Sequence, residues 1–244
     1  MTITTTDKNY LPFCQNIESI FKESNQSIHK ARNEIKIVNY QQKELVIKAF
    51  KVPHIINKIA YGFFRSSKAE KSYNNSLKIS DFVPKPIAYI EEKKFGLLKK
   101  SYFISEHFNY DFTIREPLTT SNFKNKETIY KAFANFTNNL HNNKINHLDY
   151  SPGNILIKKN DKSYKFQIID INRMEFKILT TNERLENFAK LWATDEDLTI
   201  IIKEYAKINK LDENEALNIA LKASQKHKDK KNFKKRLKGK KVVD

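Results

Sequence analysis

The chain has 244 residues, a formal net charge of +17, and a composition that is 39% hydrophobic and 30% charged. These values fit a soluble globular protein that is long enough for one bilobal domain or two small ones. The single cysteine, Cys14, excludes an internal disulfide framework and a cysteine-based metal cluster, so we expect it to be a small buried hydrophobe.

The start of the chain and its hydropathy bear on where the protein resides. The first residues lack a basic region followed by an apolar region, so they do not form a signal peptide. No stretch approaches about 18 consecutive apolar residues, so we expect no transmembrane helix. We therefore expect a cytoplasmic protein.

The first part of the chain is predicted to be rich in strands. Residues 1–25 show no clear element, whereas residues 28–51 alternate with turn-like breaks, as in a β-meander. In this region the almost wholly apolar stretch ELVIKAF has one charge in its interior, Lys48. Residues 83–92 and 96–108 predict further strands, which gives about five strands in all.

One helix is predicted within this strand-rich part, over the sequence RSSKAEKSYNNSLKI. Ala69, Tyr73 and Leu77 lie four apart, as on one face of a helix. Ser66 or Ser67 can cap the start of this helix.

Beyond residue 120 the pattern becomes helical. A buried helical stripe is predicted at Ile129, Phe133, Phe136 and Leu140. Two short strands, NILIKK and YKFQIID, follow and are joined by a polar turn. Further helices are predicted around residues 185–192, 198–205 and 214–223. A strand-rich part followed by a helical part predicts an α+β fold.

The segment HLDYSPGNILI, residues 147–157, concentrates chemically active residues just before an apolar run. It places His147, Asp149 and Asn154 close together, with Pro152 and Gly153 between them. Phosphoryl transfer needs a carboxylate that deprotonates the attacking hydroxyl and hard oxygen ligands for metal ions. We therefore interpret this segment as a phosphoryl-transfer catalytic loop.

Two residues elsewhere complete the same pattern. Lys48 lies in a predicted strand, and Asp170 ends the apolar stretch FQIID, 16 residues after Asn154. Protein-kinase-like chains have an H-x-D motif with Asn five residues after the Asp, then a metal-binding Asp that ends a strand. Each feature alone is common, but their joint order on the right kinds of element indicates a kinase.

These residues also carry a family resemblance. HLDYSPGNILI and IIDINRMEF resemble the lipopolysaccharide kinase family, the Kdo/WaaP group of protein-kinase-like enzymes, and especially its short members in Bacteroidetes-type bacteria. The likeness spans about residues 28 to 206 and includes KARNEIKI, PKPIAYIEE and NFAKLW. It implies a bilobal protein-kinase-like fold with a small β-rich N-lobe containing one helix (1–105), a larger helical C-lobe (106–221) and a basic tail (222–244).

The resemblance implies a role for each residue of the pattern. Lys48 would bind the donor phosphates, and Asp149 would be the base that faces the sugar hydroxyl. Asn154 and Asp170 would hold Mg²⁺. His147 would be structural, with its ring bonded to backbone near Asp170.

The resemblance also implies the substrates. The donor would be ATP, with its adenine bound by the backbone of a hinge made of Glu106, His107 and Phe108. The acceptor would be a Kdo or heptose hydroxyl of the lipopolysaccharide inner core.

Two features depart from the family pattern. The phosphate loop has Ala31 where a glycine is expected, and a non-glycine residue adopts positive φ only at a cost. Nearby polar residues that could compensate are Lys30, Arg32 and Asn33. In addition, the helix residue expected to pair with Lys48 is either Glu70 or Asn74, and an amide could not neutralise the lysine.

The basic residues leave alternatives open. Residues 222–241 carry 11 lysines or arginines, one acid and one aromatic side chain. This segment either binds the anionic inner membrane surface or is a solvated helix or disordered tail. Few aromatic side chains lie among the lysines, so we expect no nucleic-acid partner. Arg173 either contacts an anionic substrate or is structural.

Three functions follow from the sequence. The leading hypothesis is a membrane-peripheral, ATP- and Mg²⁺-dependent kinase for a lipopolysaccharide core sugar. The first alternative is a kinase for another small-molecule or protein acceptor, because the fold does not select the acceptor. The second is a pseudokinase that binds nucleotide or a partner without turnover.

Overall fold

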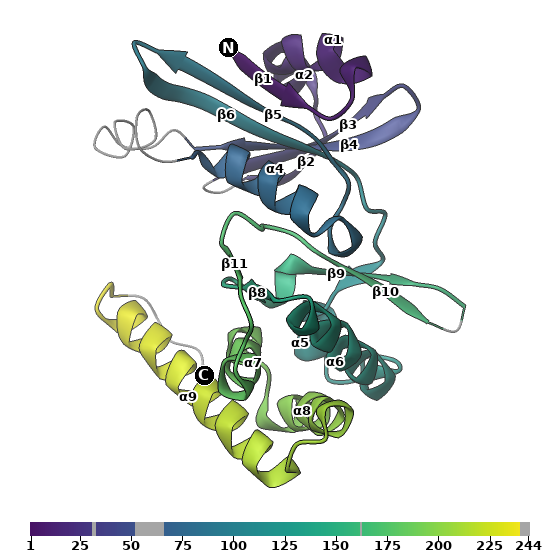
Figure 1. Ribbon diagram of the computed structural model, residues 1–244, viewed down its shortest axis with the longest axis vertical. Coiled ribbons are helices and arrows are strands. Elements are labelled where there is room, and N and C mark those ends of the chain that lie inside the picture. Colours follow the sequence, from purple (N-terminus) through teal and green to yellow (C-terminus); the bar gives the residue numbers. More distant parts are fainter. Residues whose placement is uncertain (31–32, 52–65, 162, 240–244) are drawn as a thin grey trace. The chain divides into compact units, whose positions relative to one another are not determined.

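The computed structural model describes residues 1–30, 33–51, 66–161 and 163–239 (Figure 1). The chain divides into two compact units. Unit 1 contains Met1–Asn109 together with the short segment Asp170–Asn172, and unit 2 contains Tyr110–Ile169 and Arg173–Asp244. The expected functional division at residues 105 and 221 stays a prediction.

Unit 1 is built on a six-stranded sheet in the order β1-β5-β6-β4-β3-β2, with every neighbouring pair antiparallel. The strands are β1 (Thr2–Thr5), β2 (Ser27–Lys30), β3 (Asn33–Tyr40), β4 (Lys43–Phe50), β5 (Pro86–Lys94) and β6 (Leu97–Glu106). The strands expected in residues 28–51, 83–92 and 96–108 are confirmed. Lys48 lies on the internal strand β4, opposite Ile35 on β3 and Phe103 on β6.

One face of this sheet is covered by elements that the sequence did not predict. Residues 1–25 contain β1, the short turn η1 (Lys8–Tyr10), α1 (Leu11–Gln15) and α2 (Ile17–Glu23). Phe13, Cys14 and Ile17 from the two helices pack with Leu45 and Ile47 of β4 in one buried cluster. Burial raises the pKa of the Cys14 thiol to about 11, and the expected buried hydrophobe is confirmed.

The opposite face of the sheet is covered by α4 (Lys68–Lys78), as Figure 1 shows. Ser67 caps this helix, and its Oγ accepts the Glu70 N–H at 3.1 Å. Tyr73 packs against Tyr89 of β5 with ring centroids 5.3 Å apart. Side chains alternate along a strand, so Lys48 points to this face while Ile47 points to the other. The turn η2 (Ser80–Phe82) follows α4.

Unit 2 combines small sheets with helices. Its strands are β7 (Phe112–Thr113), β8 (Ile145–His147), β9 (Ile155–Lys159), β10 (Tyr164–Ile168) and β11 (Met174–Phe176), in the orders β10-β9-β7 and β11-β8. Its helices are α5 (Arg115–Thr119), α6 (Lys126–Asn142), α7 (Thr181–Asn187), α8 (Asp195–Asn209) and α9 (Glu213–Arg236), with the 3₁₀ turns η3 (Pro152–Asn154) and η4 (Phe188–Leu191).

The core of unit 2 centres on α6. The predicted stripe is confirmed, because Ile129, Phe133 and Leu140 are buried and Phe136 is half-buried. The helix expected over residues 185–192 is in fact two pieces, since α7 ends at Asn187 and η4 follows. The αL conformation at the end of η4, at Trp192 (φ 57°), ends the helical run.

The helix α9 extends well past the predicted range 214–223. It is 24 residues long, and its buried residues Ala216, Ala220, Ser224 and Asn232 recur at multiples of four. Lys228 Nζ donates to the Ala193 carbonyl at 2.9 Å. Much of the basic segment is therefore a helix packed on unit 2. In the part of the chain that the structure covers, no helix is long and apolar enough to cross a membrane.

Candidate active site

The predicted catalytic loop lies in unit 2 between two strands. His147 ends β8, and Ile155 begins β9. Between them the chain turns through η3, where Asn154 N–H donates to Ser151 O at 2.9 Å. A Cβ on Gly153 would lie 2.5 Å from Arg115 Nη2, so glycine lets this arginine lie directly on the loop.

His147 fixes the loop from within. Its Nδ1 accepts the Asp149 N–H at 3.0 Å, so the ring proton lies on Nε2, which donates to the Ile169 carbonyl at 2.9 Å. Ile169 directly precedes Asp170 in the chain. His147 therefore makes the backbone contact that the family resemblance implies.

Asn154 is held by the same loop. Its Nδ2 donates to the Asp149 carbonyl at 2.9 Å, and its own carbonyl accepts the Ile169 N–H at 2.9 Å. With the amide nitrogen so engaged, the amide oxygen Oδ1 has no hydrogen-bond partner among the described residues. The half-buried Asp149 carboxylate likewise has no hydrogen bond or ion pair within the described ranges.

The other half of the predicted pattern lies in unit 1. Lys48 Nζ lies 2.5 Å from Asp170 Oδ1, and Asn172 Nδ2 donates to the same oxygen at 2.6 Å. Asp170 has φ of 59°, a left-handed conformation that costs a non-glycine residue free energy. The Lys48 side chain is 13% exposed and the Asp170 side chain 31%, so this ion pair is partly shielded from water. Within unit 1 these contacts orient the Asp170 carboxylate.

The helix α4 contributes to this arrangement through an unexpected residue. Asn75 Nδ2 donates to the Ile171 carbonyl at 2.7 Å and so fixes the segment 170–172. Asn74 is exposed, and in the part of the chain that the structure describes Lys48 has its ion pair with Asp170, not with Glu70. Asn75 and Asn172 were missed by sequence reasoning; the only signal was their adjacency to Asn74 and Asp170.

The predicted hinge residues follow the end of β6. The Glu106 N–H donates to Lys85 O and the His107 N–H to Glu44 O, each at 2.9 Å. Glu106 also pairs with Lys43 at 3.0 Å. Adenine would therefore have to bind other backbone groups of the hinge, which also contains the half-buried Phe108.

The remaining predicted residues are less informative. Ala31 and Arg32 of the phosphate loop lie outside the described residues, and Asn33 Oδ1 accepts the Lys51 N–H at 3.4 Å. Arg173 has an exposed side chain, and its carbonyl accepts the Leu148 N–H at 3.1 Å.

The chemistry of the two predicted ligands, each taken by itself, suits Mg²⁺. Asp170 would offer a carboxylate and Asn154 an amide oxygen, and both are hard ligands of the kind that Mg²⁺ takes in small number beside phosphates and waters. Among the described residues no group of three or more His, Cys, Asp or Glu side chains could hold a metal ion.

Three comparisons place the chain among known proteins. The model of the lipopolysaccharide kinase (Kdo/WaaP) family matches residues 72–211, more than half of the chain. The solved structure of WaaP in complex with acyl carrier protein is similar in fold, with a TM-score of 0.59, 12% sequence identity, and coverage of 93% of this chain and 99% of that chain. No curated protein matches the chain. The fold is thus the mixed α+β fold of WaaP, and the chain belongs to the lipopolysaccharide kinase (Kdo/WaaP) family.

Proposed function

We propose that this protein transfers a phosphoryl group from ATP to a hydroxyl of a lipopolysaccharide inner-core sugar, Kdo or heptose, with Mg²⁺. Membership of a lipopolysaccharide kinase family supports the reaction class. The observation that carries the proposal is the ring of His147, which joins the Asp149 N–H to the Ile169 carbonyl, directly before Asp170. That contact ties the loop of the proposed base to the residue that precedes the proposed metal ligand.

Asp149 is the proposed base. Its carboxylate is half-buried and has no polar partner within the described ranges, so it is available to accept a proton from a hydroxyl. Its backbone is held on both sides, by His147 through the N–H and by Asn154 through the carbonyl. A base held in this way orients the attacking hydroxyl without reorganisation of the loop.

The remaining predicted residues are assigned to the donor. Lys48 would bind the ATP phosphates, Asp170 and Asn154 would hold Mg²⁺, and the backbone of Glu106–Phe108 would meet adenine. When bound, Mg²⁺ neutralises charge on the phosphates. Because Lys48 is paired with Asp170, a phosphate oxygen of ATP would have to replace the Asp170 carboxylate as the partner of Lys48.

The direct test is phosphate transfer from Mg·ATP to purified Kdo–lipid A. We expect transfer by the wild type and a loss of about 10²–10⁴-fold in Asp149→Asn, with Mg·ATP affinity unchanged. Asp161→Asn, at an exposed turn, is the matched control and should retain the wild-type rate. An Asp149→Asn variant as active as the wild type would remove Asp149 as the base.

The structure also gives a reason to keep the pseudokinase alternative. In the described part of α4 no acid pairs with Lys48, which instead pairs with the proposed metal ligand. A pseudokinase would bind Mg·ATP saturably and transfer phosphate to no acceptor. A kinase for another acceptor would bind Mg·ATP and transfer phosphate only when that acceptor is supplied in a screen.

A further inference from the structure

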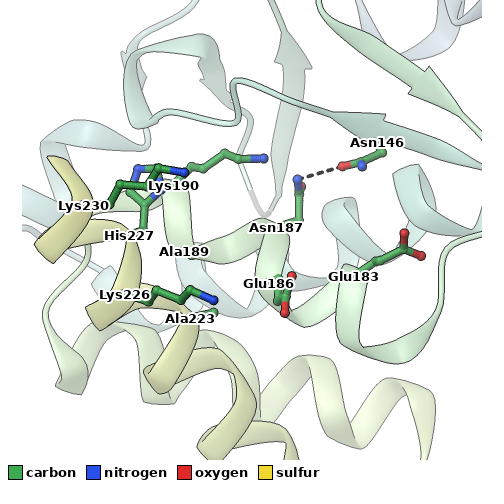
Figure 2. A pocket seen from close by; sticks show the side chains of 10 residues that line it. All are labelled: Asn146, Glu183, Glu186, Asn187, Ala189, Lys190, Ala223, Lys226, His227 and Lys230. Carbon is green, nitrogen blue, oxygen red and sulfur yellow. Dashed lines mark hydrogen bonds between the residues drawn. The ribbon is translucent and has the colours of Figure 1, made fainter.

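A pocket of about 310 Å³ lies within unit 2, between α7, η4 and α9 (Figure 2). Its lining includes Asn146, Asn187, Lys190, Lys226, His227 and Lys230. The volume falls at the lower end of the range of roughly 300–1,000 Å³ that is usual for ligand sites. The pocket is therefore large enough to take a small polar ligand.

The charges on the pocket lining are unbalanced. Three lysines line it, and in the described part of the chain none of them has an ion pair. Two glutamates also line it, but Glu183 is already paired with Lys177 at 2.5 Å and bonded to Thr180. These contacts lower the pKa of Glu183 to about 2, so its charge is committed elsewhere. Glu186 is then the one remaining acid on the described lining, and Asp149 and Glu175 also act on Lys190 from outside it.

Lys190 is the least hydrated of these cations. It is half-buried on η4, and burial lowers the pKa of its ammonium group. His227 on α9 is also half-buried, and its pKa is lowered by burial and then by the positive charges of Lys231, Lys190 and Lys230. A partly desolvated cation that no acid pairs with directly is unfavourable, and an anion bound in the pocket would relieve that cost.

The pocket is joined to the catalytic loop. Asn187 is 4% exposed, and its Nδ2 donates to the His147 carbonyl at 3.1 Å and to Asn146 Oδ1 at 2.9 Å. The negative charge of Asp149 acts on both Lys190 and His227, raising their pKa against the effect of burial. Lys190 and His227 therefore lie within electrostatic range of the proposed base.

We propose that Lys190, His227 and Lys230 bind an anionic group of the acceptor, a carboxylate or a phosphate, and so hold its hydroxyl for Asp149. This inference rests on the proposed function and adds a selection rule, because a neutral acceptor would lose this contact. The three side chains are positioning residues; they act on the substrate away from the reacting hydroxyl. They also give the basic α9 a role that does not depend on a membrane.

The test is binding of two probes, free Kdo for the carboxylate and inorganic phosphate for the phosphate, by calorimetry without nucleotide. We expect saturable binding of one probe by the wild type. Lys190→Gln and Lys230→Gln should each weaken it by about fivefold or more, the loss of one charge-assisted hydrogen bond. Lys222→Gln, an exposed α9 residue outside the pocket lining, removes the same charge and should leave binding unchanged.

The possible outcomes test the anion site separately from the proposed function. The probe that binds identifies the anionic group. If Lys222→Gln weakened probe binding as much as Lys190→Gln and Lys230→Gln do, overall charge would explain the effect and the pocket would have no specific role. Unchanged probe binding in Lys190→Gln and Lys230→Gln would overturn the inference, and so would a failure of the wild type to bind either probe. Mg·ATP affinity and transfer to Kdo–lipid A are measured in the same variants. Intact probe binding without transfer to Kdo–lipid A would contradict the proposed core-sugar kinase and leave the anion site standing.

Discussion

Lys48 in unit 1 and Lys190 in unit 2 are both largely withdrawn from water, but only Lys48 is paired. Lys48 Nζ lies 2.5 Å from Asp170, whereas Lys190 has no ion pair among the described residues and shares a pocket with Lys226 and Lys230. The charge of Lys48 is balanced by the Asp170 carboxylate, which the lysine in turn orients. Lys190 belongs to a cluster of three lysines that an anionic ligand would neutralise.

This difference suggests which lysine would bind which of the two proposed substrates. A lysine that already holds an anionic group can exchange it for the phosphates of ATP, and the released carboxylate is then available to a metal. A lysine cluster without a counter-ion favours an anionic ligand over a neutral one. We therefore assign Lys48 to the donor and Lys190 to the acceptor.

The largest expected effect comes from the partner of Lys48. Asp170→Ala should weaken Mg·ATP binding on the order of 100-fold, because it removes the proposed metal ligand and leaves Lys48 unpaired. Binding with and without Mg²⁺, measured by calorimetry, checks this. Asp81→Ala, at an exposed position of unit 1, should bind as the wild type does. Unchanged Mg²⁺ dependence in Asp170→Ala would exclude the metal role.

Desolvation in unit 2 also acts on a buried histidine, and this predicts a pH dependence of stability. Burial lowers the pKa of His141 to about 4, and its Nδ1 lies 2.8 Å from the Tyr205 hydroxyl. The unfolded state, with a pKa of about 6.5, binds more protons, so stability present above pH 6.5 is lost as the pH falls toward 4. We expect a loss of about 2 kcal/mol between pH 7 and pH 5.

Urea unfolding of the wild type and His141→Gln at both pH values measures that loss. Glutamine can still form a hydrogen bond with the Tyr205 hydroxyl but does not titrate. The variant should therefore have the smaller change in the free energy of unfolding. An identical pH dependence in both proteins would show that His141 is not the responsible group.

Replacing each of the two lysines by methionine should change the free energy of unfolding in opposite directions. Lys48→Met leaves Asp170 without its cation and should lower the free energy of unfolding by about 1 kcal/mol, a value reduced by the partial exposure of the pair. Lys190→Met removes a partly desolvated cation that has no ion pair among the described residues, and it should be neutral or stabilising. Chemical denaturation at low salt, with Lys71→Met as an exposed control, compares them. Equal destabilisation by Lys48→Met and Lys190→Met would contradict the proposed difference between the two lysines.

The smallest effect is expected on the outer face of α9. We propose that its exposed lysines bring the protein to anionic membranes, each worth up to about 1 kcal/mol. Deleting residues 222–244 would remove the buried Ser224 and Asn232, so a substitution is the cleaner test. Lys231→Gln should reduce binding to phosphatidylglycerol vesicles about twofold to fivefold at low salt and not at high salt. Salt-independent or unaltered binding would contradict this role.

The sequence predicted what depends on regular spacing. The strands of unit 1 and the stripe of α6 follow from residue periodicity, and the α4 cap from a serine before an apolar pattern. The helices α1 and α2 were missed because five and seven residues are too few for a helical period to stand out.

The partners of the site residues were harder to predict. The sequence predicts the partner of Lys48 in the helix at residues 65–79, whereas in the structure the partner is Asp170, 122 residues away. Successive helix residues point about 100° apart, so Asn75 and not Asn74 reaches the segment 170–172. The basic pocket joins residues from Asn146 to Lys230, which only tertiary packing brings together.

The most direct test of this account is steady-state transfer from Mg·ATP to Kdo–lipid A by Lys48→Gln and Lys190→Gln, with each substrate varied in turn. We predict that Lys48→Gln raises KM for ATP and leaves KM for the acceptor unchanged, while Lys190→Gln does the reverse. If both variants changed KM for the same substrate, the assignment of one lysine to the donor and the other to the acceptor would be wrong.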